Sequence, residues 1–271
     1  MTIADQAFFT HDGDALIPTP IARGPWGDTI SGMMVGGLLG RAVEQCGGDS
    51  DLQPARLTVD LLRPVSIAAP VRVDAAVERD GKRIRLVDAR MWQNDVVVAR
   101  ASGLYLRRGE QPTDAAWTLP IEMPPLPAEA QQPSGDFTME MWAYSANSGT
   151  TAPSTDLSEW RNGGQKYAWV RDMKALVDGE PLTPFVRVAM AGDVTSSLTH
   201  FSAGGLNYIN ADYTVTLSRL PDGEHIGLAA LTHYSHAGVA TGTATLFDHQ
   251  GPIGTGVATA LANPGFRPPR R

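Results

Sequence analysis

The feature that most constrains this chain is an order of elements that occurs twice along its 271 residues. Residues 57–64 read LTVDLLRP and residues 213–221 read YTVTLSRLP, so Thr, Val, Leu and Arg recur at matching positions. A helical stretch precedes each segment, and two hairpin-like stretches follow it. Self-similarity over so long a period indicates duplication of a whole structural unit, because solenoid repeats are much shorter. Chance similarity between two antiparallel meanders is the alternative.

The helix of the first unit is predicted over residues 32–45, which read GMMVGGLLGRAVEQ. Three glycines, Gly36, Gly37 and Gly40, lie inside this stretch. Each costs about 1 kcal/mol of helix stability relative to alanine. Glycines at this spacing indicate a helix that is pressed closely against another backbone.

Four strands are expected after this helix, because alternating apolar runs are separated by turn sequences. They are predicted over residues 56–64, 71–79, 82–93 and 96–106. Asp80-Gly81 and Asn94-Asp95 separate the later strands, and such dipeptides between strand-like runs are strong hairpin signals. The first unit therefore reads as one helix followed by a four-stranded meander.

The second unit repeats this order after a change of composition. Residues 109–158 are rich in proline and small polar residues, which indicates a linker, while Trp142 and Tyr144 suggest that its later part pairs or packs. A helix is expected near residues 184–199, and strands are expected over 166–173, 207–219, 225–234, 238–247 and 253–262. We therefore divide the chain into domains 1–108 and 159–271, joined by the segment 109–158. Residues 1–28, with several prolines, are expected to be irregular.

Composition narrows the function classes. The net charge of −7 is the wrong sign for a nucleic-acid-binding protein, which carries basic patches. Since we find neither a membrane-spanning apolar run of ~18 residues nor a signal peptide, we expect a soluble cytoplasmic protein. The single cysteine, Cys46, excludes an internal disulfide and a cysteine-based zinc cluster. A packing role is favoured for Cys46, with a nucleophile as the alternative.

Three stretches carry a resemblance to a known family. They are GMMVGGLLGRAV at 32–43, WVRDMKALVDGEPLTPFVRVAMAGDVTSSL at 169–198 and NYINADYTVTLSRLPDGEHIGL at 207–228. Together they resemble the acyl-CoA thioesterase II family. The resemblance implies an α+β double hotdog fold, in which two long helices are each wrapped by a curved antiparallel β-sheet and the two sheets join edge to edge. It further implies hydrolysis of an acyl-CoA or other acyl thioester, no metal or organic cofactor, and a homodimer or higher homo-oligomer.

The same resemblance points to catalytic residues. Asp193, in AMAGDVTSSL, matches an acidic residue that orients or activates water, although an aspartate that caps a helix is the structural alternative. Asn210 matches a Thr or Asn on the facing strand. By the strand period of two, Asn210 should share a face with Asp212, Thr214 and Thr216, so a solvated polar stripe is its alternative role.

A third position departs from the family pattern. The family places a glutamine on its last strand, and here that position is Ala258, which offers no side-chain hydrogen bond. Thr255 and Thr259 are nearby candidates to replace it, but Thr259 should point to the opposite face from Ala258. The alternative function is therefore a catalytically weak or inactive protein that binds acyl-CoA.

Other chemistries have weaker support. His225, His233 and His236 cluster in sequence, but His233 and His236 are expected to flank a turn, and metal ligands must converge. A hydratase that uses Asp193 and His200 ranks last, because these residues lie seven apart along a helix. The nucleophile elbow GxSxG is absent from the sequence, which argues against a serine hydrolase.

Overall fold

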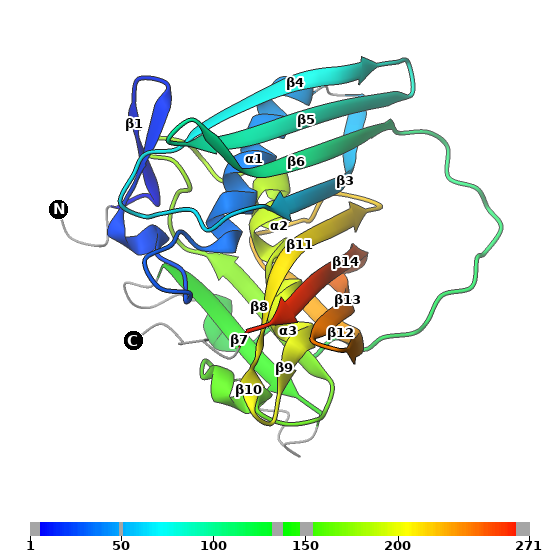
Figure 1. Cartoon of the computed structure of the whole chain (residues 1–271). Helices are drawn as coiled ribbons and strands as arrows, with labels where there is room; N and C mark the ends of the chain where they lie inside the picture. Colours follow the sequence, from blue (N-terminus) through cyan, green and yellow to red (C-terminus); the bar gives the residue numbers. More distant parts are fainter. Residues whose placement is uncertain (1–5, 49–50, 132–137, 147–153, 264–271) are drawn as a thin grey trace.

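The architecture is one strongly curved antiparallel sheet wrapped around a small group of helices (Figure 1). The computed structural model describes residues 6–48, 51–131, 138–146 and 154–263. Ten strands form the sheet in this order: β4 (Arg72–Asp80), β5 (Ile84–Gln93), β6 (Val96–Arg107), β3 (Leu52–Leu61), β11 (Tyr208–Leu217), β14 (Gly251–Ala262), β13 (Val239–Asp248), β12 (Ile226–His236), β8 (Lys166–Asp172) and β7 (Met139–Ser145).

The two halves of the sequence meet at the centre of this sheet. Strand β3 of the first half pairs antiparallel with β11 of the second, from Asp60 opposite Asp212 to Arg56 opposite Thr216. The expected edge-to-edge joining of the two sheets is therefore confirmed. Each half also keeps its meander, since β4-β5-β6 and β12-β13-β14 are consecutive in sequence and adjacent in the sheet.

The second helix differs from the expectation of one long helix. Helix α1 (Gly32–Gly47) is continuous, but the other helical segment is divided into α2 (Pro184–Gly192) and α3 (Val194–His200). The division falls at Asp193, whose N–H bonds to the carbonyl of Met190, three residues back, at 3.3 Å. An α-helix requires a bond to the fourth residue back, so its regular ladder is interrupted here.

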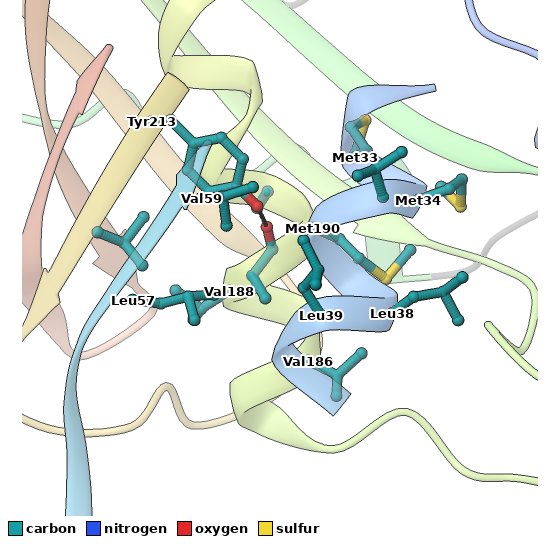
Figure 2. Close-up of a cluster of buried hydrophobic side chains, with 14 of the residues drawn as sticks. Met33, Met34, Leu38, Leu39, Leu57, Val59, Val186, Val188, Met190 and Tyr213 are labelled. Atoms are coloured by element: carbon teal, nitrogen blue, oxygen red, sulfur yellow. Dashed lines mark hydrogen bonds between the residues drawn. The ribbon is translucent and has the colours of Figure 1, made fainter. Parts of the chain in front are cut away.

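Helix α1 packs directly against α2, as its glycines predicted. A Cβ atom on Gly40 would lie 2.6 Å from the Cβ of Ala189, and one on Gly36 would lie 1.7 Å from the hydroxyl of Tyr213. That hydroxyl donates to the carbonyl of Ala189 at 2.5 Å. Figure 2 shows the apolar side chains around this contact, among them Met33, Met34, Leu38, Leu39, Leu57, Val59, Val186, Val188 and Met190. Together with the inner face of the sheet they form the main core.

The segment before α1 is more regular than expected. Strands β1 (Phe9–Asp12) and β2 (Ala15–Pro18) form a hairpin that turns at Gly13, where φ is +58°. Pro18 ends β2, and Pro20 begins a short 3-10 helix, η2 (Pro20–Ala22). Phe8 and Phe9 are buried, which anchors the segment in the core.

Residues 121–126 of the proline-rich connection pack on the outer face of the sheet. Trp169 donates its indole N–H to the carbonyl of Pro124 at 2.8 Å, and the hydroxyl of Tyr144 donates to Pro125 at 2.8 Å. Ile121, Met123 and Leu126 pack onto the same outer cluster. The later part of this connection includes β7, which pairs with β8, as Trp142 and Tyr144 indicated. Short elements complete the described chain: η3 (Ala128–Gln131), η4 (Leu157–Trp160), β9 (Phe201–Ser202) and β10 (Gly205–Leu206).

Candidate functional site

Asp193 and Asn210 come together at the break between α2 and α3. The side-chain amide of Asn210, on β11, donates a hydrogen bond to Oδ1 of Asp193 at 2.8 Å. The backbone N–H of Met33, in the first turn of α1, also bonds to the Asp193 carboxylate. The carboxylate therefore sits at the N-terminus of a helix from the other half, where the helix dipole favours negative charge.

The first half approaches Asp193 very closely. A Cβ atom on Gly32 would lie 2.6 Å from Oδ1 of Asp193, so a larger residue here would displace the carboxylate. Neither Gly32 nor the Met33 N–H could be assigned to the site from the sequence, since local patterns do not report contacts between distant segments. The one available signal was the glycine that opens the predicted helix.

Asn210 lies on the opposite face from the one expected. A β-bulge shifts the pairing of β11 with β14 between Asn210 and Asp212, so Ala211 is an extra residue in the strand. An extra residue reverses the alternation of faces. Asn210 therefore points inward to Asp193, while Asp212 points outward and accepts hydrogen bonds from Thr259. The shared polar face predicted for Asn210, Asp212 and Thr214 is wrong for Asn210.

Burial sets the protonation of the candidate base. It raises the pKa of Asp193 to about 6, while the hydrogen bonds from Asn210 and from the Met33 N–H act in the opposite direction. A carboxyl group with this pKa is mostly ionised at pH 7 but still basic enough to accept a proton. General bases are most effective when their pKa lies near the working pH.

Ala258 is fully buried on the inner face of β14, opposite Tyr213 of β11. Thr255 bonds to Thr216 at 2.7 Å and Thr259 donates to Asp212 at 2.8 Å, and these contacts are made on the outer face. The suggestion that Thr255 or Thr259 replaces the family glutamine is therefore wrong. The side chain of residue 258 faces the interior and offers only a methyl group.

A cavity of about 700 Å³ lies beyond this pair. Tyr208, two residues before Asn210, and His200, at the end of α3, belong to its wall. Asp193 and Asn210 are not among the residues that line it. The cavity therefore shares α3 and β11 with the elements around the candidate catalytic pair but does not enclose the pair.

Comparison with known proteins decides the family. The model of the acyl-CoA thioesterase N-terminal domain matches residues 22–106, and that of the acyl-CoA thioesterase C-terminal domain matches residues 112–262. The chain belongs to the acyl-CoA thioesterase family. No curated protein sequence matches it significantly.

Solved structures share the fold of this acyl-CoA thioesterase family member. The tesB protein of Mycobacterium avium subsp. paratuberculosis superposes with a TM-score of 0.66 at 15% identity, over 96% of each chain. A hot dog fold protein of unknown function from Alicyclobacillus acidocaldarius gives 0.65 at 15% identity, over 100% of this chain and 99% of that one. Acyl-CoA thioesterase II TesB2 of Mycobacterium marinum gives 0.59 at 16% identity, over 86% and 90%.

The histidines of this acyl-CoA thioesterase family member are arranged differently from the expectation. His233 and His236 both lie within β12, and the turn follows them. The structure brings His233 to His200, with ring centroids 5.1 Å apart. His200 Nδ1 bonds to the carbonyl of Ser196 at 2.7 Å, and the contacts described for His200 do not include Asp193.

The described residues hold neither a cluster of metal-ligating side chains nor a membrane-spanning helix. Within them, no group of three or more His, Cys, Asp or Glu side chains is placed to hold a metal ion. Nor is any helix in that part of the chain long and apolar enough to span a membrane. Cys46 is partly buried and packs against the main core.

Proposed function

We propose that this protein hydrolyses an acyl-CoA to the free acid and CoA, with Asp193 as the general base and Asn210 as its partner. The observation that supports this most is the 2.8 Å hydrogen bond from the Asn210 amide to the Asp193 carboxylate. It joins two residues from separate elements at a partly buried position, and the raised pKa of Asp193 suits proton transfer. Membership of the acyl-CoA thioesterase family supports the choice of substrate.

In the proposed reaction, Asp193 accepts a proton from water as the water oxygen attacks the thioester carbonyl carbon. The tetrahedral intermediate then collapses, the carbon–sulfur bond breaks, and the proton returns from Asp193 to the CoA thiolate. Asn210 orients the carboxylate and helps to hold the water or the thioester carbonyl. Each proton and bond is thus accounted for without a metal or an organic cofactor.

The test is release of free thiol from a panel of acyl-CoAs that differ in chain length and branching. Asp193→Asn should lower turnover by at least ~10²-fold while binding changes little, because a general base contributes about that much. Asp178→Asn is the matched control, since Asp178 is exposed. Unchanged turnover in a folded Asp193→Asn variant would return Asp193 to a structural role.

The alternative proposal is an acyl-CoA-binding protein with little or no activity, and Ala258 motivates it. It would be supported if the wild-type chain bound acyl-CoA but released no thiol from any member of the panel. We also propose that residues 1–108 and 159–271 act as two hotdog units joined by 109–158. A homodimer or larger assembly, and a cytoplasmic location, stay predictions that sedimentation and cell fractionation would test.

A further inference from the structure

Tyr213 is a buried tyrosine on β11, three residues after Asn210, and the proposed reaction does not use it. The residue is 0% exposed, and its ring is directed from the inner face of the sheet toward the helices (Figure 2). Its hydroxyl donates to the carbonyl of Ala189, in α2, at 2.5 Å. Burial and the nearby charge of Asp193 raise the pKa of Tyr213 well above its usual value, so the hydroxyl keeps its proton and remains a donor.

The carbonyl of Ala189 is the acceptor that a regular helix would give to Asp193. In an α-helix each N–H bonds to the carbonyl four residues back, which for Asp193 is that of Ala189. The Asp193 N–H bonds instead to the carbonyl of Met190, three residues back, at 3.3 Å. The Ser196 N–H likewise bonds to the carbonyl of Asp193, three residues back, at 3.2 Å. The Tyr213 hydroxyl therefore occupies the acceptor that the helix lacks at the break between α2 and α3.

Two glycines admit the Tyr213 side chain at this break. A Cβ atom on Gly36, in α1, would lie 1.7 Å from the Tyr213 hydroxyl oxygen. A Cβ atom on Gly192, the last residue of α2, would lie 2.8 Å from Cε2 of the ring. The ring thus packs against the residue that precedes Asp193, and the hydroxyl lies where α1 and α2 meet. A side chain at either glycine would displace the ring or its hydroxyl.

The bulge in β11 lets one strand hold both the side chain and the backbone around Asp193. Asn210 and Tyr213 are three residues apart, so strict alternation would place them on opposite faces. The extra residue, Ala211, brings both to the inner face. Asn210 then donates to the Asp193 carboxylate at 2.8 Å, while Tyr213 donates to the turn of backbone that precedes it.

We propose that Tyr213 is a positioning residue for Asp193. By occupying the carbonyl of Ala189, its hydroxyl keeps the helix interrupted at Asp193 and so holds the carboxylate against Asn210. This inference rests on the proposed role of Asp193 in hydrolysis. Tyr213 acts through the backbone, and it makes no contact with substrate in this scheme.

Loss of the hydroxyl should allow the helix to become regular. The Asp193 N–H would then bond to the vacated carbonyl of Ala189. A 3-10 helix advances about 120° per residue and an α-helix about 100°, so Asp193 would turn by roughly 20°. Such a turn moves the end of a side chain by about 1 Å, and a misplacement of about 1 Å can lower a rate by ~10²-fold.

The first test compares two tyrosines. Tyr213→Phe removes the hydroxyl and keeps the ring. Tyr105→Phe is the matched control, because Tyr105 is 1% exposed and its hydroxyl donates to a helix carbonyl, that of Val43 near the end of α1, at 3.2 Å. Thiol release from the acyl-CoA that the wild type hydrolyses fastest gives kcat and KM. We expect Tyr213→Phe to lower kcat by at least ~10-fold with little change in KM, and Tyr105→Phe to keep the wild-type kcat. An unchanged kcat in folded Tyr213→Phe would overturn the proposal.

The second test needs no turnover and follows the Asp193 carboxyl by ¹³C NMR during a pH titration. Hydrogen bonds from Asn210 and from the Met33 N–H lower the pKa of Asp193, against the larger effect of burial. Tyr213→Phe should weaken these bonds and raise this pKa by roughly one pH unit, whereas Tyr105→Phe should leave it unchanged. A pKa at or below that of the wild type in folded Tyr213→Phe would overturn the proposal. If the pKa rises but the wild type releases no thiol, the proposed hydrolysis fails while the positioning of Asp193 by Tyr213 stands.

The third test also serves if Tyr213→Phe does not fold, because it begins with the wild type. Scalar coupling across hydrogen bonds should join the Asp193 amide nitrogen to the carbonyl carbon of Met190 and not to that of Ala189. A wild-type coupling to Ala189 would show that the hydroxyl does not displace the amide, and it would overturn the proposal. In folded Tyr213→Phe the coupling should change to Ala189. A coupling that stays with Met190 in that variant would equally overturn the proposal.

Discussion

Thr58 and Thr214 lie directly opposite each other where β3 pairs with β11, and the hydroxyl of Thr214 donates to that of Thr58 at 2.9 Å. These two threonines hold the same position in the repeated sequence. Equivalent residues of two antiparallel strands face each other at a twofold axis. The two halves of the chain therefore meet as two protomers of a symmetric dimer would.

The first prediction concerns the number of substrate-binding sites per chain. The two halves share a fold, but their helical segments carry acidic residues at different positions. In α1 the acidic residue is Glu44, near the end of the helix, where it accepts a hydrogen bond from Thr183 at 2.6 Å. Asp193 lies in the middle of the corresponding segment of the second half. We expect S-octyl-CoA, a thioether analogue of an acyl-CoA that cannot be hydrolysed, to bind with a stoichiometry of one per chain in calorimetry. Two equivalent sites per chain would contradict the assignment of the site to Asp193.

The second prediction concerns the contact between α1 and α2. Gly40→Ala adds a methyl group whose carbon would lie 2.6 Å from the Cβ of Ala189, so the two helices must move apart. Overpacking of this kind costs about 1–3 kcal/mol, against a gain of about 1 kcal/mol in helix propensity. We expect a net loss of up to about 2 kcal/mol in urea denaturation. Gly109→Ala is the control, because a Cβ atom there meets nothing within 4 Å. A Gly40→Ala protein as stable as wild type would show that the helices are less tightly packed.

The third prediction concerns stability against pH. Burial raises the pKa of Asp193 to about 6, above the ~3.9 of an aspartate in an unfolded chain. The folded protein therefore keeps the Asp193 carboxyl protonated up to a higher pH than the unfolded chain does. The stability that Asp193 contributes is therefore fully present below about pH 4 and is lost as the pH rises through about 6. Burial also raises the pKa of Asp172 to about 7, so its contribution to stability likewise falls as the pH rises. Burial lowers the pKa of His200 to about 4, so the contribution of His200 rises with pH. The effect of one group must therefore be isolated by comparing variants.

Asp193→Asn removes the titrating group and keeps an oxygen acceptor. Relative to wild type, this variant should become more stable as the pH rises from 4 to 7, by roughly 1–3 kcal/mol in total. Chemical denaturation of both proteins at each pH measures the difference. The catalytic rate should change in the other direction, since kcat/KM of the wild type should rise through about pH 6 as Asp193 ionises. If the difference in stability between wild type and Asp193→Asn did not vary with pH, the raised pKa of Asp193 would be contradicted.

Much of this arrangement could be predicted from local sequence. The Asp80-Gly81 and Asn94-Asp95 turns separate alternating apolar runs, so the hairpins of the first half were clear. The glycines of α1 correctly indicated a close helix contact, because glycine inside a helix needs such a reason. The approach of Asp193 to Asn210 came from family resemblance, since the two residues lie 17 apart in sequence and on different elements.

The errors have physical causes that a single sequence conceals. One extra residue, Ala211, forms a bulge and reverses the face of Asn210, which strict alternation cannot anticipate. The hairpin of β1 and β2 has strands of only four residues each, too short for a periodic pattern. The cover formed by residues 121–126 depends on hydrogen bonds to Trp169 and Tyr144, which are formed only after distant segments meet.

The last prediction concerns Ala258, the position at which the family resemblance implies a glutamine. Ala258 lies on the inner face of β14, next to Ala260, which pairs with Asn210. A glutamine here would extend from the same face that presents Asn210 to Asp193. Losing one preorganised hydrogen-bond donor commonly costs on the order of 3 kcal/mol, or ~10²-fold in rate. We therefore expect slow hydrolysis by the wild type, and an increase in kcat larger than any gain in affinity for Ala258→Gln.

This gain should come with a loss of stability. Ala258 is 0% exposed, so the longer side chain must displace its neighbours, at a cost of about 1–3 kcal/mol. Ala258→Met is the matched control, because it has a similar length and lacks the amide. If kcat rises only for Gln while both variants melt at lower temperature, the amide is responsible. If wild-type hydrolysis is fast and Ala258→Gln slows it, another group already supplies the hydrogen bond expected of the glutamine. The inner face of β14 would then be adapted to alanine, and the catalytic set would include a residue other than Asp193 and Asn210.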